Sequence, residues 1–81
     1  MVNSVHTKRY HLFREILIDA RKEQELSQAA LAKKLGRLQT FVSKYERGER
    51  RLDVVEFLEV TAALKLDPYN VLKAIKAIGN K

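Results

Sequence analysis

Residues that begin or end helices recur along this sequence at short intervals, and they limit the chain to short helices. Gly36 and Gly48 each predict the end of a helix, because glycine takes the left-handed conformation without a steric penalty. Asp67 and Pro68 predict the start of another, since a capping side chain precedes a proline at the first helical position. Between these points apolar residues recur at helical spacing, and the alternation typical of strands is absent. The sequence therefore predicts an all-α fold.

Five helices are expected from these signals. They span about residues 10–25, 28–35, 39–47, 53–66 and 67–78, with Gly79 as the last stop. Ser27 is a good N-cap for the second helix, and Asp53 with Glu56 forms a capping-box pattern at the start of the fourth. The apolar stripe of the fourth helix is expected at Val55, Leu58, Ala62 and Leu66. The fifth carries a wider stripe, at Val71, Leu72, Ala74, Ile75 and Ile78.

A length of 81 residues allows one domain, which we expect over residues 10–79, preceded by a flexible basic arm over residues 1–9. The absence of cysteine excludes a disulfide framework and a zinc finger. Stretches without charge, such as residues 26–32, are far shorter than the roughly 20 residues of a membrane helix. Charged residues also interrupt the N-terminal region, so no signal peptide is expected. These features predict a soluble, cytoplasmic, non-secreted protein.

The excess of positive charge is unevenly distributed. Residues 33–51 contain seven basic and two acidic residues, a net charge of +5, whereas residues 52–68 carry −3. A dense basic segment beside an acidic one is typical of a surface that binds a polyanion on one side. A solvated helical face gives the same pattern. Charge alone does not decide between these two interpretations.

The stretch from Ser27 to Gly48 reads SQAALAKKLGRLQTFVSKYERG. Ala32 is small where two helices must cross closely, and Gly36 permits the tight turn between them. This stretch resembles the helix-turn-helix of the phage-repressor family, the Cro/C1 or XRE class. The matching positions are Gln28, Ala29, Leu31, Ala32, Leu35, Gly36, Val42, Ser43, Glu46 and Gly48. The resemblance covers about residues 12–72 and implies the five-helix, lambda-repressor-like DNA-binding domain, with the motif at its second and third helices.

Two residues of the turn depart from the family pattern. Arg37 stands where many members have a small aliphatic residue, and Leu38 stands where a serine or threonine usually caps the recognition helix. Losing that cap costs about 1 kcal/mol. The sequence leaves open whether Leu38 packs inward in place of the missing aliphatic residue.

The resemblance implies which side chains contact DNA, because the third helix of such proteins enters the major groove. Contacts to base edges are then expected from Gln39, Thr40, Ser43 and Lys44. Contacts to phosphates are expected from Gln28, Arg37, Arg50 and Arg51. An amide such as that of Gln39 suits adenine, and an ammonium such as that of Lys44 suits guanine. Any of these side chains can instead contact only phosphate or water.

Three further residues are assigned by resemblance. Gln28 lies eleven residues before Gln39, a spacing similar to that of phage repressors in which two glutamines hydrogen-bond across the motif. Arg21 and Glu46 match a pair that forms an internal salt bridge in family members, so we expect both to be structural.

No catalytic, metal or cofactor site is expected. His6 and His11 lack a third ligand at a suitable spacing, and no serine has a histidine and a carboxylate to serve it. The three glycines are helix stops, so a glycine-rich phosphate loop is excluded. No small-molecule ligand is evident.

The sequence thus predicts a sequence-specific regulator of transcription that binds double-stranded DNA, favouring a repressor that works as a homodimer on a palindromic operator. One alternative is a controller of a restriction–modification operon, or an autoregulator of the antitoxin type. Another is a protein-interaction module that uses the same fold, although the +5 segment disfavours it. Because 81 residues leave little room for an effector domain, regulation is expected through DNA occupancy, dimerisation or a partner protein.

Overall fold

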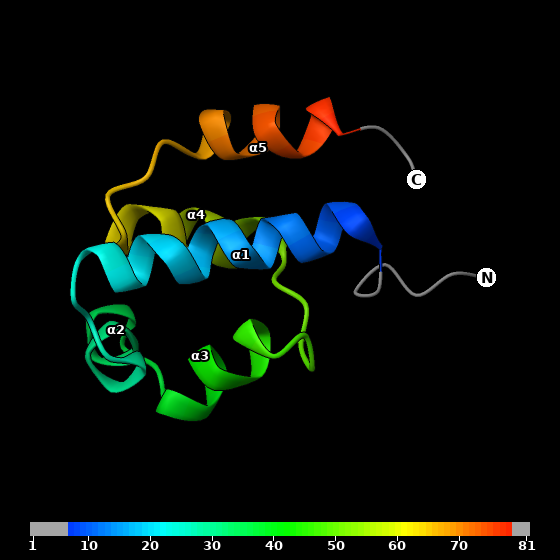
Figure 1. Ribbon diagram of the computed structural model, residues 1–81. Helices are drawn as coiled ribbons and strands as arrows, with labels where there is room; N and C mark the ends of the chain where they lie inside the picture. The colour runs from blue at the N-terminus through cyan, green and yellow to red at the C-terminus, as the bar shows by residue number, and fades with distance from the viewer. Residues whose placement is uncertain (1–6, 79–81) are drawn as a thin grey trace.

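The computed structural model describes residues 7–78, and it confirms the predicted all-α fold (Figure 1). Five helices follow in the order α1 (Lys8–Glu23), α2 (Gln28–Leu35), α3 (Gln39–Glu46), α4 (Val54–Ala63) and α5 (Pro68–Ala77). The bounds of α2 agree with the sequence-based prediction, and the others differ by one to three residues. Helix α1 begins at Lys8, inside the predicted arm, while residues 1–6 of that arm and Gly79 lie outside the described residues.

Side-chain caps place the starts of α2 and α4 where the sequence predicts them. Ser27 Oγ accepts a hydrogen bond of 3.0 Å from the backbone N–H of Ala30. At the start of α4 the capping box is complete: Asp53 accepts from the Glu56 N–H at 2.7 Å, and Glu56 accepts from the Asp53 N–H at 3.0 Å. Each bond satisfies an N–H that the helix itself leaves unpaired.

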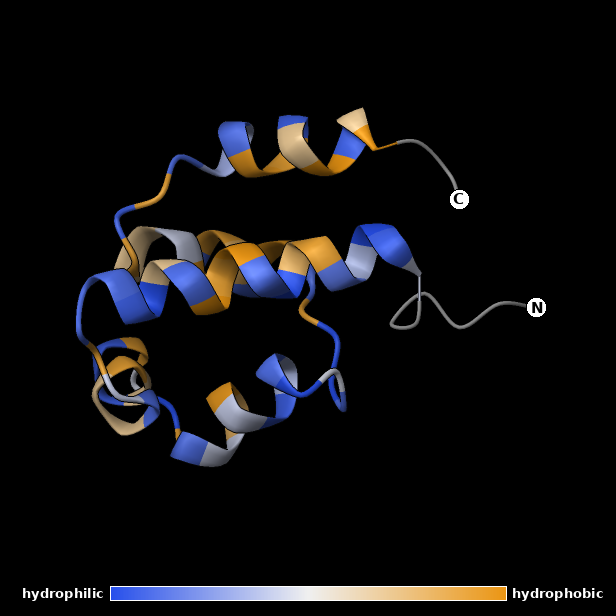
Figure 2. Ribbon diagram, in the orientation of Figure 1, coloured by the Kyte–Doolittle hydropathy of each residue, from blue (hydrophilic) through white to orange (hydrophobic). Residues whose placement is uncertain are grey.

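The helices pack around α1 and α4, with α2 and α3 on one side and α5 on the other (Figure 1). Apolar residues face the space between them, as Figure 2 shows most clearly on α4 and α5. The core joins α1, α2, α3 and the C-terminal half of α4, and its fully buried members include Leu17, Leu31, Val42, Tyr45, Val60 and Leu64. Among residues 7–78, no helix is long and apolar enough to span a membrane.

Three of the four residues predicted to form the apolar stripe of α4 are exposed, and only Leu66, which follows the helix, packs against the core. Val55 and Leu58 are 64% and 49% exposed, whereas Phe57, Val60 and Thr61 point into the protein. The sequence VVEFLEVTAA is apolar around most of its circumference, so helical spacing alone cannot select the inner face. The fifth helix shows a related difference, since Val71 is buried while Leu72 is 52% exposed.

Candidate nucleic-acid interface

Helices α2 and α3 form a compact two-helix unit that fixes the orientation of α3. Gly36 adopts φ = +68°, and the N–H of Arg37 then bonds back to the carbonyl of Ala32 at 2.9 Å. This arrangement ends α2 abruptly and reverses the chain. Leu31, Ala32 and Val42 are buried between the two helices and the core. Because these contacts leave α3 on the surface, its outer face is free to contact another molecule.

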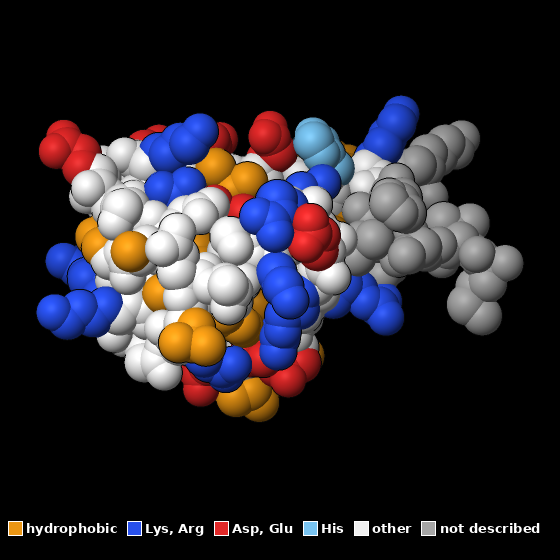
Figure 3. Space-filling view, turned by 90° about the horizontal axis from the view of Figure 1, so that it is seen from below, with side chains coloured by type: hydrophobic (Ala, Val, Ile, Leu, Met, Phe, Trp, Pro, Cys, Tyr) orange, Lys and Arg blue, Asp and Glu red, His pale blue; other side chains and the backbone are white. Residues whose placement is uncertain are grey.

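Three of the four predicted base-contacting residues project into solvent from α3. Gln39, Thr40 and Lys44 are exposed, and Ser43 is half-buried with its hydroxyl donating to the Thr40 carbonyl at 3.3 Å. Figure 3 views the molecule from the side of α2 and α3. Lys and Arg side chains there lie around a central area of other side chains and backbone, with hydrophobic side chains scattered over the face and Asp and Glu beside some of the basic groups. Such a surface combines neutral hydrogen-bonding groups with a positive margin, as duplex DNA requires.

Glu46 at the end of α3 lies at the centre of a buried polar network. Arg21 donates two hydrogen bonds to its carboxylate, from Nε at 2.7 Å and from Nη2 at 3.0 Å. These bonds raise the pKa of Arg21 further, so its charge is permanent. Gln28 Nε2 adds a third bond at 2.8 Å. Three helices therefore meet at one carboxylate, which ties α3 to both α1 and α2.

The position of Gln28 corrects the expected bond between the two glutamines. Its side-chain amide donates to Glu46 rather than to Gln39. Glu46 is buried and anionic, so it is a stronger acceptor than a solvated amide. Gln28 keeps its place at the N-terminus of α2, where a phosphate can approach, but Gln39 is oriented by α3 alone.

Arg37 and Arg50, predicted as phosphate contacts, come together on the ring of Phe41. Their guanidinium carbons lie 4.5 Å and 4.8 Å from the ring centroid, within the range of cation–π contact. Arg50 also donates two bonds to Glu56, at 2.8 Å and 2.7 Å, while Arg37 lies 3.5 Å from Glu56 and 3.5 Å from Glu59. The bonds from Arg50, aided by the Asp53 N–H, lower the pKa of Glu56 to about 2. Both arginines are thus held beside α3, and acidic residues of α4 partly neutralise them.

Arg51 is exposed in the connection between α3 and α4, and its carbonyl accepts a bond of 3.0 Å from Arg50. The basic residue Arg47 is also exposed, and it pairs with Glu49 at 2.9 Å. Lys44, the basic residue of α3 itself, is exposed as well.

Arg14 was missed by sequence reasoning. Its Nη1 donates 2.8 Å to the carbonyl of Glu46, in the last turn of α3, where a cation opposes the negative end of the helix dipole. Gly48 follows with φ = +78°, and a β-carbon at this position would lie 3.2 Å from Arg14 Cζ. A basic residue on the first helix gives no signal of such a contact, because its partner is 32 residues away.

Leu38 resolves the question that the sequence left open. Its backbone adopts N-cap geometry, with φ = −74° and ψ = 152°, but its side chain makes no capping bond. The side chain is 79% exposed, so it does not pack inward. At the position of the missing aliphatic residue, the guanidinium of Arg37 lies over the ring of Phe41.

Comparisons with known proteins agree with this geometry. The helix-turn-helix family model matches residues 17–69. An XRE-family like protein from Pseudomonas syringae pv. tomato is similar in structure, with a TM-score of 0.81 and 43% identity over 86% of this chain and 85% of that one. The restriction–modification controller protein C.AhdI from Aeromonas hydrophila gives a TM-score of 0.68 and 32% identity, over 74% of this chain and 91% of that one. A search of curated protein sequences found no match. The chain belongs to the helix-turn-helix family of the XRE, or Cro/C1, type.

Proposed function

We propose that this protein is a sequence-specific repressor that reads the major groove of double-stranded DNA with α3. As an XRE-type helix-turn-helix protein it is a DNA-binding transcriptional regulator. The observation that carries the specific proposal is the exposure of Gln39, Thr40 and Lys44 on one surface helix. These side chains present a donor and acceptor, a hydroxyl and a cation, which are the groups that distinguish base edges. We propose a cytoplasmic location, where such a regulator meets its DNA.

Phosphate contacts are proposed at Gln28, Arg37, Arg50 and Arg51. Of these residues, Arg51 is exposed on the connection beyond α3, where it can follow the backbone without reading sequence. Arg37 and Arg50 are held on Phe41, so a phosphate there would meet two guanidinium groups whose positions are already fixed. Fixed cations lose little side-chain entropy on binding.

Comparing two variants tests the division between base and phosphate contacts. Gln39→Ala should lower affinity for the preferred site by about 1 to 3 kcal/mol and relax preference at one base pair in each half-site. Arg51→Ala should weaken all sequences by a similar factor and make the logarithmic salt slope shallower by about one. Binding is measured on the preferred and on a scrambled duplex over a range of salt. If Gln39→Ala leaves the ratio of the two affinities intact, α3 does not read bases as proposed.

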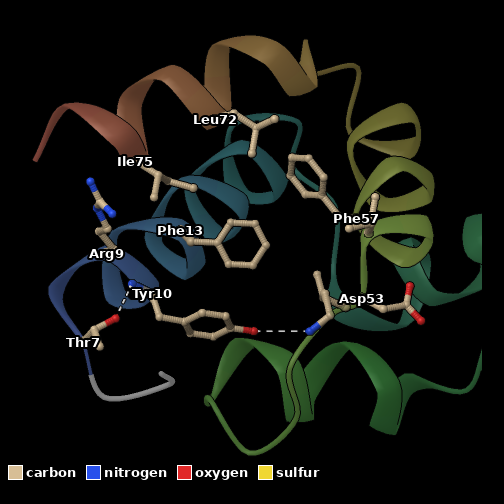
Figure 4. Close-up of a pocket in the computed structure, with 10 residues that line it drawn as sticks. Thr7, Arg9, Tyr10, Phe13, Asp53, Phe57, Leu72 and Ile75 are labelled. Carbon is tan, nitrogen blue, oxygen red and sulfur yellow. Dashed lines mark hydrogen bonds between the residues drawn. The ribbon is translucent and has the colours of Figure 1, made fainter. Parts of the chain in front are cut away.

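We propose that the protein dimerises through α4 and α5, which matches a palindromic operator. Val54, Leu58 and Leu72 are exposed apolar residues of these helices. Val54 and Leu72 border a hollow of about 390 Å³ between α1, α4 and α5. Figure 4 shows that Phe13, Phe57 and Ile75 also point into it, while Tyr10 closes one end by accepting a bond from the Leu52 N–H at 3.3 Å. A surface of this kind is more apolar than a solvated helix pair needs.

A role as controller of a restriction–modification operon is the second candidate, and the similarity to C.AhdI favours it. Genes for a restriction endonuclease and a methyltransferase beside the gene for this protein would support that role. Loss of repression of those genes in a deletion strain would test it directly. A protein-interaction module is the remaining alternative, and it predicts no salt-dependent binding to duplex DNA.

A further inference from the structure

Leu38 is an exposed leucine that contributes neither to the core nor to a helix cap. Seven large apolar residues are exposed among those described, and the other six belong to α4, to α5 or to the residue that follows α5. Leu38 alone lies in the helix-turn-helix, directly before α3. Helix α3 lies on the opposite side of the molecule from α5 (Figure 1). A dimer formed through α4 and α5 would therefore leave Leu38 in water.

Helix α3 also lacks a side-chain cap at this position. Leu38 has the backbone geometry of an N-cap residue, in which a serine or threonine would stabilise α3. Leucine supplies no such bond, and its side chain is 79% exposed. Neither the stability of α3 nor the packing of the core thus accounts for an apolar side chain here.

The surroundings of Leu38 specify the kind of molecule that could cover it. It borders a hollow of about 340 Å³ together with the cationic side chains of Arg37, Lys44 and Arg50. Thr40, a proposed base contact, lines the same hollow. A partner that fits must combine negative charge with a small apolar group. In the major groove of DNA the base edges offer one such group, the 5-methyl of thymine.

We propose that Leu38 is a specificity-determining residue that packs on the 5-methyl group of a thymine in each half-site. The thymine would lie beside the base pair contacted by Gln39, because the two residues are adjacent at the start of α3. This inference rests on the proposed function. The contact of Leu38 adds a preference for thymine that the polar side chains of α3 do not supply. It depends on complementary shape and apolar contact rather than on a hydrogen bond.

Replacing thymine by deoxyuridine tests the contact, because the substitution removes the methyl group and keeps the hydrogen-bonding edge. A preferred duplex is first selected from a random pool, and each thymine is then replaced in turn. Wild-type protein should lose about three- to fivefold in affinity at one thymine per half-site, as expected for one buried methyl group. Leu38→Ala should bind the thymine and deoxyuridine duplexes equally well at that position. Leu38→Met, which keeps an apolar side chain of similar length, should retain the difference.

The outcomes separate this inference from the function on which it rests. Absence of a preferred duplex would contradict both the proposed function and the thymine contact. A preferred duplex that is insensitive to deoxyuridine at every thymine would overturn the thymine contact and leave the function standing. If Leu38→Ala loses as much affinity as the wild-type protein when thymine is replaced by deoxyuridine, the thymine contact is likewise overturned and the function stands. Because the side chain is exposed, each variant should melt close to the wild-type temperature, and this control excludes misfolding.

Discussion

At the scale of single residues, the most constrained group is the carboxylate of Glu46. It is buried, Arg21 compensates its charge, and Gln28 adds a further hydrogen bond. Sequence comparison could pair Arg21 with Glu46, since both positions match the family. It could not predict the direction of Gln28, because a side-chain rotamer depends on which acceptor is stronger in the folded protein.

Removing Arg21 should therefore destabilise the protein far more than removing an exposed arginine. We expect Arg21→Ala to cost about 3 kcal/mol or more, because it leaves a buried carboxylate without its cation. A double-mutant cycle with Glu46→Ala, measured by denaturant unfolding, should give a coupling energy above about 1 kcal/mol. The exposed pair of Arg47 and Glu49 is the control, and its coupling should not exceed experimental error. If the losses in the free energy of unfolding caused by Arg21→Ala and Glu46→Ala simply add in the double variant, the two side chains do not interact.

The lowered pKa of Glu56 predicts how the stability of the protein changes as the pH falls. Its pKa of about 2 lies below the ordinary 4.5, mainly because Arg50 donates to the carboxylate. A lowered pKa stabilises the folded state above the ordinary value, and this contribution is lost as the pH falls from 4.5 towards 2. Glu56→Gln should remove about 1 to 2 kcal/mol at neutral pH and flatten the decline between pH 4.5 and 2. Thermal melts of both proteins across this range test the expectation, and parallel curves would contradict it.

At the scale of helices, elements marked at both ends by local signals could be predicted closely. Helix α2 begins after the Ser27 cap and ends before Gly36, and its bounds agree with the prediction. Helix α4 has a clear start but was assigned the wrong buried face, because its sequence is apolar on nearly all sides. Its rotation is decided by tertiary contacts, in which Glu56 turns toward Arg50. Local chemistry thus determines where a helix begins, whereas packing determines which face it buries.

The two glycines with a left-handed backbone, Gly36 after α2 and Gly48 after α3, provide a matched test of the contact between Arg14 and the end of α3. A β-carbon at Gly36 would meet nothing within 4 Å, so Gly36→Ala should cost only the unfavourable backbone conformation, about 1 to 2 kcal/mol. At Gly48 the same carbon would approach Arg14 Cζ to 3.2 Å and disturb the bond to the Glu46 carbonyl. Gly48→Ala should therefore be the more destabilising change in denaturant unfolding. The difference between the two should vanish in an Arg14→Ala background; if it persists there, the contact with Arg14 is not its cause.

At the scale of the whole molecule, α3 and α5 lie on opposite sides of α1 and α4 (Figure 1). The surface of α3 carries the proposed DNA contacts and the exposed Leu38, and α5 carries the exposed apolar residues Tyr69 and Leu72. The uneven charge of the sequence left a one-sided polyanion surface and a solvated face as equal interpretations, and it could not show that Arg37 and Arg50 pair with Glu56. Those pairs join the basic segment to the acidic one, so the net positive potential near α3 is lower than the sequence count suggests.

The separation of the two surfaces predicts that dimerisation can be removed without altering base recognition. Leu72→Asp places a charge on the exposed apolar surface of α5, and burying it between two protomers would cost several kcal/mol. We expect the variant to sediment as a monomer that remains folded, and to bind the two-fold operator more weakly at low protein concentration. Its preference among single half-sites should match that of the wild-type protein, because α3 is unchanged. Asn70→Asp introduces the same charge at an exposed polar position of α5 and should remain dimeric. A wild-type protein that sediments as a monomer both free and on its operator would exclude this interface, and the half-sites would then have to be read independently.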